Sequence, residues 1–187
     1  RARGKYLQFV DSDDQLDPNA TRLLVEAAEE TQADLVICNY CSVMPDGKTT
    51  VHGFMQPYTK MDKAQFARCL MEEPASFYYG VMWNKLYRAD LVRAHTDVRC
   101  SEEMTWSEDL YFNLTYIRYA ERFFALTAPI YNYYDNPGSA VHLTKVRTAI
   151  TARTALFSYY KELYEQLGLY EENKLQIFKY LISSSET

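Results

Sequence analysis

The sequence lacks the features that membrane-spanning, secreted and nucleic-acid-binding proteins share. None of its apolar stretches is long enough to cross a bilayer, and its first residues carry no secretory signal pattern. The formal net charge is −5, and no run of Lys or Arg would follow a phosphate backbone. We therefore expect no transmembrane segment and no nucleic-acid partner.

Cysteine is also scarce, with four residues: Cys38, Cys41, Cys69 and Cys100. Cys38 and Cys41 form a CxxC pair, but neither a second pair nor a His pair follows at the spacing of a zinc site. Both lie in a strand-like run, in which an offset of three places side chains on opposite faces. We therefore expect buried, reduced thiols rather than a metal or redox centre, which fits a reducing cytosol.

The apolar content is sufficient for one domain with a sizeable core, because 48% of the 187 residues are hydrophobic. Tyrosine is abundant, with 17 residues. Its ring combines an apolar face with a hydroxyl group, which suits sugars and wet clefts, although most of these rings are expected in the core.

Strand-like and helical patterns alternate along the chain. Strands are expected at residues 5–10, 35–43, 49–54, 123–126 and 130–134. Helices are expected at residues 18–31, 59–72, 88–95 and 108–120, and two more follow residue 144, separated near Gly168. This order predicts an α/β fold in which a mixed sheet is covered on both faces and a helical tail follows. We divide the chain into residues 1–142 and a helical extension, 143–187.

Several polar residues predict where these elements begin and turn. Asp17 is the expected N-cap of the first helix, and Thr59 with Asp62 resembles a capping box for the second. Ser107 is expected to cap the helix at 108–120. The segment 45–47 (PDG) predicts a hairpin turn between two strands.

The beginning of the chain suggests that earlier elements are missing. Residues 5–10 read as a buried parallel strand, which needs neighbouring strands, and no strand candidate precedes them. The chain also begins with Arg1 rather than Met. We therefore expect upstream βα units to be absent from this sequence.

Three aspartates, Asp11, Asp13 and Asp14, follow the end of that strand. Ligands of open α/β sheets bind at the carboxyl ends of strands, and clustered carboxylates repel one another unless a cation compensates. A hard divalent cation with a diphosphate would satisfy them. The alternative is a turn and helix start, for which Asp and Ser are good cappers.

Other metal and phosphate motifs fit this segment poorly. An EF-hand loop requires Gly at its sixth position, where Leu16 stands. Haloacid dehalogenases also place two aspartates after a strand, but they continue with Gly-Thr or a similar pair, whereas Asp14 and Gln15 stand here. A second acidic pair, Glu108 and Asp109, lies in the first turn of a predicted helix, where the helix dipole alone favours acids.

Four segments in series resemble the family 2 glycosyltransferases, which have the GT-A fold. Residues 9–16 (FVDSDDQL) resemble the DxD segment, and residues 81–88 (VMWNKLYR) resemble the W-x-K-L-Y-[KR] segment. Residues 107–112 (SEDLYF) resemble the E-D helix start, and residues 133–139 (YYDNPGS) resemble the Y-x-x-x-x-x-S tail segment. The resemblance covers about residues 1–142 and implies a partial, Rossmann-like GT-A sheet whose nucleotide-binding start is missing.

The resemblance implies roles for the acids. Asp13 would be a ligand of Mn²⁺ or Mg²⁺ against the donor diphosphate, with Asp11 near the ribose or the metal. Asp109 would be the general base, and Glu108 would lie near the acceptor. Asp14 would also be close to the substrate.

Five more residues complete the predicted substrate site. Trp83, Asn84 and Lys85 are expected to line the acceptor or donor-sugar pocket, with core packing as the alternative for Trp83. Ser139 and His142 are expected to close over the diphosphate, although a lone His is more often a loop or surface residue.

The implied activity is transfer of a sugar from a nucleotide-sugar to a hydroxyl acceptor, with inversion and with a divalent metal, in cell-surface polysaccharide synthesis. The expected acceptor is a glycan or lipid-linked glycan at the cytoplasmic face of the membrane, with peripheral membrane association or a homo-oligomer as further expectations. Because base-recognising elements are expected before Arg1, the chain alone should bind the donor poorly and be inactive. The alternatives are a metal-dependent phosphohydrolase and a non-catalytic interaction domain.

Overall fold

The computed structural model describes residues 2–53, 59–74, 76–101, 107–136 and 146–182. Its centre is a seven-stranded mixed sheet with the order β1-β6-β3-β7-β2, in which β4 pairs with β3 and β5 with β7. The strands are β1 (Tyr6–Gln8), β2 (Gln15–Leu16), β3 (Leu35–Val43), β4 (Thr49–His52), β5 (Thr59–Asp62), β6 (Lys85–Arg88) and β7 (Arg122–Tyr134). The predicted α/β fold with a mixed sheet is confirmed.

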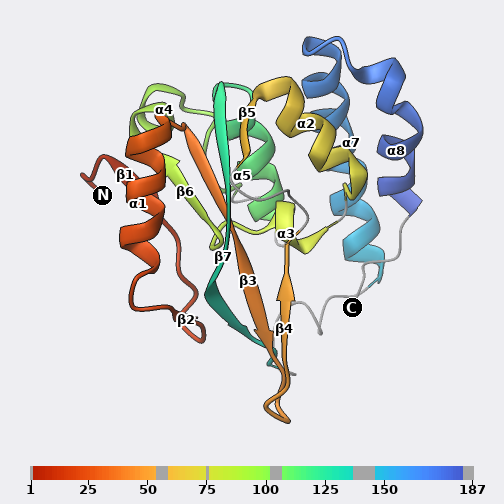
Figure 1. Ribbon diagram of the computed structural model, residues 1–187. Helices are drawn as coiled ribbons and strands as arrows, with labels where there is room; N and C mark the ends of the chain where they lie inside the picture. The colour runs from red at the N-terminus through yellow and green to blue at the C-terminus, as the bar shows by residue number, and fades with distance from the viewer. Residues whose placement is uncertain (1, 54–58, 75, 102–106, 137–145, 183–187) are drawn as a thin grey trace.

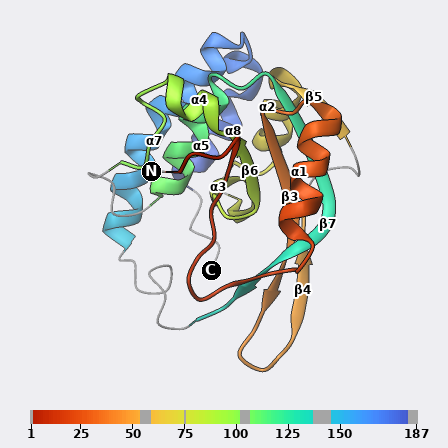
Figure 2. The same ribbon diagram turned by 90° about the vertical axis from the view of Figure 1, so that its left-hand side faces the viewer.

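Helices cover both faces of the sheet (Figures 1 and 2). The helices are α1 (Ala20–Thr31), α2 (Lys63–Glu72), α3 (Phe77–Gly80), α4 (Ala89–Ala94), α5 (Glu108–Ile117), α7 (Val146–Gln166) and α8 (Tyr170–Ile182). Helix α1 packs on one face, where Leu24 and Ala28 meet Val36 and Phe124 in a smaller apolar cluster. The other face carries α2, α3, α5, α7 and α8 over the larger cluster.

The long parallel pair of β3 and β7 forms the middle of the sheet. The registers run from Leu35 opposite Phe123 to Val43 opposite Tyr134, with a bulge around Asn39. Both strands are rich in β-branched and aromatic residues and are buried in their first halves, as central strands require. The expected strand at 35–43 is confirmed, but the two short strands expected at 123–126 and 130–134 are one continuous strand.

Strand β1 differs from the expected buried parallel strand. It lies at the edge of the sheet, pairs antiparallel with β6, and its three residues are only half-buried. The antiparallel pairing with β6 was not predicted, because the apolar run does not reveal pairing partners. Strands β2, β5 and β6 were not predicted either, because each is formed by pairing with a strand that is distant in the sequence.

The helix starts also correct the sequence prediction. Helix α1 has Asn19 at its N-cap without a side-chain bond, while Asp17 Oδ1 accepts the backbone N–H of Asn19. The capping box of α2 joins Asp62 to Gln65, and Thr59 lies in β5. The β3–β4 hairpin turns at Gly47, whose φ of 83° suits glycine, so the predicted turn is confirmed.

The C-terminal helices are separated where expected and join the larger apolar cluster. The break lies at Gly168, which has a φ of 68°. Tyr160 on α7 donates its hydroxyl proton to the carbonyl of Pro74, and Tyr164 donates to that of Ala67. In the described part of the chain, no helix is both long and apolar enough to cross a membrane.

The cysteines are all unpaired. Cys38 is buried, and burial raises the pKa of its thiol to about 12. Cys41 is half-buried and Cys100 is exposed. The expectation of buried thiols in the CxxC pair is therefore confirmed for Cys38, whereas Cys41 is only half-buried.

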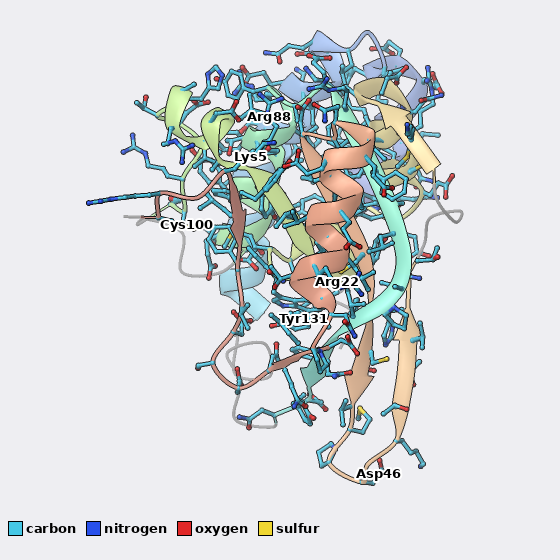
Figure 3. All side chains as sticks on the ribbon, turned by 60° about the vertical axis from the view of Figure 1, so that its left-hand side comes forward. Lys5, Arg22, Asp46, Arg88, Cys100 and Tyr131 are labelled. Atoms are coloured by element: carbon cyan, nitrogen blue, oxygen red, sulfur yellow. The ribbon has the colours of Figure 1, made fainter. Side chains whose placement is uncertain are left out.

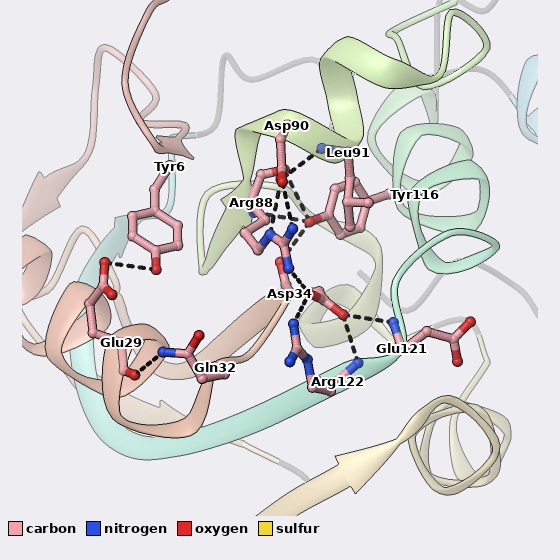
Figure 4. A network of polar contacts seen from close by, with 10 residues as sticks. All are labelled: Tyr6, Glu29, Gln32, Asp34, Arg88, Asp90, Leu91, Tyr116, Glu121 and Arg122. Atoms are coloured by element: carbon pink, nitrogen blue, oxygen red, sulfur yellow. Dashed lines mark hydrogen bonds and ion pairs between the residues drawn. The ribbon is translucent and has the colours of Figure 1, made fainter.

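A buried carboxylate ties together the ends of three strands (Figure 4). Asp34, just before β3, accepts from the guanidinium groups of Arg88 at 2.7 Å and Arg122 at 3.1 Å. Its second oxygen accepts the backbone N–H groups of Glu121 and Arg122. Its carbonyl accepts the hydroxyl of Tyr116 on α5 at 2.6 Å. Burial raises the pKa of Asp34, but these hydrogen bonds and charges outweigh it, so the pKa lies below its ordinary value.

Replacing Asp34 with Ala should destabilise the fold by roughly 2–4 kcal/mol, because it leaves Arg88 and two backbone N–H groups without their acceptor. The loss should be full near pH 7 and shrink on acidification, because a carboxyl with a lowered folded pKa contributes stability only where it is ionised. Denaturant unfolding at pH 7 and at pH 3 measures both effects. Glu26→Gln, which breaks an exposed pair with Arg22, is the control and should cost less than about 1 kcal/mol. Equal losses in the two variants would contradict the role of Asp34.

Candidate active site

The loop after β1 carries the first acidic cluster. Phe9 leads into it and packs edge-on against Tyr87 and Phe112, with ring centroids 5.7 and 5.6 Å apart. Tyr87 lies on β6 and Phe112 on α5, so the end of β1 is held beside the helix that carries the second acidic pair. Residues far apart in the sequence are thereby brought to one side of the molecule.

The loop is fixed on β7 through one tyrosine. The hydroxyl of Tyr131 donates to Asp14 Oδ2 at 2.7 Å and accepts the backbone N–H of Asp11 at 3.2 Å. The other oxygen of Asp14 accepts the backbone N–H of Tyr134 at 2.9 Å. Asp14, predicted to contact substrate, therefore uses both oxygens to anchor the loop. Figure 3 shows Tyr131 beside this loop, at the opposite end of the sheet from Lys5 and Arg88.

Asp11 and Asp13 are the exposed acids of the loop. Partial desolvation raises the pKa of Asp11, and the charges of Asp14, Asp13 and Glu108 raise it further. This crowding favours a bound cation, because a cation would relieve the repulsion. Within the described ranges, however, no three His, Cys, Asp or Glu side chains come together as a metal site. The pair fits only a cation that takes its other ligands from a bound molecule.

Asp109 lies in the first turn of α5, and its carboxylate faces inward. Its Oδ2 accepts the backbone N–H of Met82 at 3.1 Å. Burial is the largest cause that raises the pKa of Asp109, to about 6, and the charges of Glu108 and Asp11 raise it as well. The hydrogen bond from Met82 and the charge of Lys85 lower this pKa and so oppose the shift. Ser107 occupies the N-cap position with a φ of 66°, but its side chain makes no capping hydrogen bond.

The two acidic clusters interact electrostatically. The charge of Asp11 contributes to the raised pKa of Asp109, and the charge of Glu108 contributes to that of Asp11. Because the interaction of two charges weakens with distance, this coupling indicates that the carboxylates lie near one another. A carboxyl with a pKa of about 6, opposite a crowded pair of acids, can accept a proton near neutral pH.

The segment at 83–85 is part of the core, which corrects the prediction that it lines a pocket. Trp83 is 3% exposed and stacks on Tyr131, with ring centroids 4.2 Å apart. Asn84 is fully buried and donates to the carbonyls of Tyr78 and Cys38. Lys85 is 1% exposed, and its ammonium group binds only acceptors inside the chain.

Two predicted residues, Ser139 and His142, lie outside the described residues.

Two features of the site are not predicted by the sequence. Tyr131 is one of 17 tyrosines, and nothing in the sequence separates it from the others. The backbone N–H of Met82 carries no sequence signal at all.

A depression of about 290 Å³ lies away from this site. It is lined by Lys5, Tyr6, Gln32, Ala33, Arg88, Asp90 and Arg93. Figure 3 places Lys5 and Arg88 at the end of the sheet opposite Tyr131. None of the acids discussed above lines it.

Known proteins show related sequences and folds. EpsH of Bacillus subtilis, named as a glycosyltransferase, is 32% identical over 176 residues, which are 92% of this chain and 45% of EpsH. EpsJ of the same organism, an uncharacterised glycosyltransferase, is 30% identical over 142 residues, 76% of this chain and 41% of EpsJ. The chain thus spans less than half the length of these curated relatives.

Solved structures show the same fold at low sequence identity. The crystal structure of Staphylococcus aureus TarS 1–349 in complex with UDP-GlcNAc has a TM-score of 0.63 at 16% identity, and the match covers 96% of this chain and 56% of TarS. TarS 1–349 without that ligand has a TM-score of 0.60 at 14% identity, over 97% of this chain and 65% of TarS. The family described as "Glycosyl transferase family 2" matches residues 1–95, half of the chain. The chain therefore belongs to glycosyl transferase family 2.

Proposed function

We propose that the full-length protein transfers a sugar from a nucleotide-sugar donor to a hydroxyl group of an acceptor. The observation that carries this proposal is the half-buried carboxylate of Asp109, which accepts the Met82 amide proton, has its pKa raised to about 6 and interacts with the charge of Asp11. Family membership supports the reaction class. The complex of TarS with UDP-GlcNAc supports a nucleotide-sugar as the donor class.

In this proposal Asp109 is the general base. It removes the proton of the acceptor hydroxyl as the oxygen attacks the anomeric carbon, and the bond from that carbon to the donor diphosphate breaks. The Met82 N–H keeps one oxygen of Asp109 in place, so the carboxylate needs little reorientation during the reaction. Glu108, the neighbouring acid, is proposed to contact the acceptor.

Asp13, with Asp11 beside it, is proposed to hold Mn²⁺ or Mg²⁺. Two carboxylates alone leave a cation short of ligands, and Mg²⁺ is commonly held by one or two carboxylates together with substrate phosphates. When bound, the cation neutralises charge on the departing diphosphate. The hydrogen bonds from Tyr131 and Tyr134 to Asp14 hold the loop that presents both acids.

The biological setting is a further proposal. Sugar transfer in cell-surface polysaccharide synthesis, onto a glycan or lipid-linked glycan at the inner face of the membrane, agrees with the family expectation. Peripheral membrane association and a homo-oligomer are part of the same proposal. The phosphohydrolase alternative ranks lower, because the chain belongs to a glycosyltransferase family.

Asp109→Asn in the full-length protein should lower kcat by about 10²–10⁴-fold, because general-base catalysis contributes on that scale. Donor affinity should remain unchanged.

Asp13→Asn should instead weaken Mn²⁺-dependent donor binding by about tenfold or more. Sugar-transfer kinetics and calorimetry separate the two effects, with the exposed Glu30→Gln on α1 as the control. An Asp109→Asn variant with full kcat would refute the assignment of the base.

The pH dependence of transfer should reflect the same carboxyl. Since the base acts in its deprotonated form, kcat should rise about tenfold per pH unit below about pH 6 and level off above it. The low residual rate of Asp109→Asn should lack this rise. A wild-type profile that stays flat from pH 4.5 to 7 would contradict the proposal.

The product should have the inverted anomeric configuration. One base and a direct attack by the acceptor lead to a single displacement, whereas retention requires a second displacement or a different path. Proton NMR of the freshly formed glycoside distinguishes the two anomers through their coupling constants. A product that keeps the configuration of the donor would overturn the mechanism while leaving the reaction class intact.

A further inference from the structure

We propose that Lys85 is a positioning residue for Asp109 and that it acts through the peptide group between Val81 and Met82. Lys85 holds the carbonyl end of this peptide, and Asp109 accepts the N–H end. These hydrogen bonds do not depend on which reaction the protein catalyses, whereas their consequence for catalysis rests on the proposed function.

The ammonium group of Lys85 is enclosed by acceptors of the chain. Its Nζ donates to the carbonyls of Tyr78, at 3.1 Å, and Val81, and to Asn84 Oδ1 at 2.8 Å. Three acceptors match the three protons of an ammonium group, whereas a neutral amine would leave one acceptor without a donor. The contacts therefore favour the charged form, while burial lowers the pKa of Lys85 to about 7.

The geometry of the peptide group transmits this contact. A trans peptide is planar, so its C=O and N–H bonds point in opposite directions. The described part of the chain contains no cis peptide. Because Lys85 fixes the direction of the Val81 carbonyl, it also fixes the direction of the Met82 N–H, which donates to Asp109 Oδ2.

Helix α5 holds the same peptide at a second point. Asn113, one turn after Asp109, is fully buried, and its Nδ2 lies 2.7 Å from the carbonyl of Gly80 and 3.2 Å from that of Val81. The hydroxyl of Tyr87 donates to Asn113 Oδ1 at 2.6 Å and fixes the amide orientation. The loop is thus attached to the helix that carries the proposed base.

The arrangement is an ion pair bridged by a peptide. A cation at the carbonyl and an anion at the N–H polarise the peptide in the same sense, which strengthens both hydrogen bonds in a buried setting. The other charged groups that act on Asp109 are Glu108 on its own helix and Asp11 on the acid loop, and both oppose its ionisation. The neutral groups nearby are Tyr87 on β6 and Cys100, whose pKa values Asp109 raises. Lys85 is the one cation among the influences identified on Asp109.

The test is proton–nitrogen NMR of the 187-residue chain between pH 4 and 9. In the wild type, the Met82 amide shift should titrate with a component whose midpoint is near 6, and Asp109→Asn should remove that component while leaving the one that arises from Lys85. In Lys85→Met, which keeps the length of the side chain without its charge, the midpoint should rise, because the charge of Lys85 lowers the pKa of Asp109. Amide exchange at Met82 should also become faster than at neighbouring buried amides.

Lys63→Met is the matched control. Lys63 also donates to a backbone carbonyl, that of Arg118, and pairs with Glu121, so its ammonium group is held away from Asp109 and from the Val81–Met82 peptide. It should lower stability and leave the Met82 midpoint unchanged. A folded Lys85→Met chain whose Met82 midpoint equals that of the wild type would overturn the proposal.

A second measurement covers the case in which Lys85→Met does not fold. Coupling between two groups is reciprocal, so removing the charge of Asp109 must lower the pKa of Lys85 by a similar amount. The carbon-13 signal of Lys85 Cε should therefore titrate at lower pH in Asp109→Asn than in the wild type. Equal midpoints in the two chains would refute the coupling.

The catalytic consequence is tested separately in the full-length protein. Lys85→Met should lower kcat and move its pH profile upward, with donor affinity unchanged, whereas a purely structural role would lower all parameters together without moving the profile. If the NMR coupling is found and no sugar transfer is detected, the proposed function fails and the positioning of Asp109 stands. If transfer is found and the coupling is absent, the positioning proposal fails alone.

Discussion

The buried carboxylate of Asp34 is the constraint on which both sides of the candidate site depend. It holds the start of β3 against the end of β6 and the start of β7, and its carbonyl fixes Tyr116 on α5. Strand β7 carries Tyr131, which anchors the acid loop, and α5 carries Asp109. The Asp34 contacts therefore fix the strand and the helix that carry the two sides of the site relative to each other. A loosened Asp34 network would disturb the site without touching it.

Local signals were sufficient for much of the fold and for the acids. The apolar run at Leu35–Val43, the turn at Gly47 and the break at Gly168 depend on residues close in sequence, and all three were predicted. The strands β5 and β6 and the continuity of β7 depend on partners far along the chain, which no local pattern reveals. The acids of the site were found because charge is visible in a sequence. Tyr131 and the Met82 amide were not, because their role exists only after folding.

The site carries an energetic cost that the rest of the fold must offset. Asp109 has a pKa of about 6, against an ordinary value of 3.8, so its ionisation in the folded chain costs roughly 3 kcal/mol. An acid with a raised folded pKa binds its proton more tightly when folded. Stability therefore falls as the pH rises from about 4 to about 6 and changes little from this group above that. Lys85 and the Met82 amide reduce the cost, and burial, Glu108 and Asp11 create it.

The buried segment from Trp83 to Lys85 shows how a residue can matter to a site without facing it. Its tryptophan stacks on Tyr131, which holds Asp11 and Asp14, and its lysine holds the peptide that binds Asp109. One short segment thus contacts the supports of both acidic clusters. Its tryptophan stacks on the tyrosine that anchors the acid loop, and its lysine polarises the peptide that binds Asp109. Replacing Lys85 with an uncharged side chain of similar size separates these two kinds of support. Such a substitution keeps the packing of the segment but removes the charge that polarises the peptide.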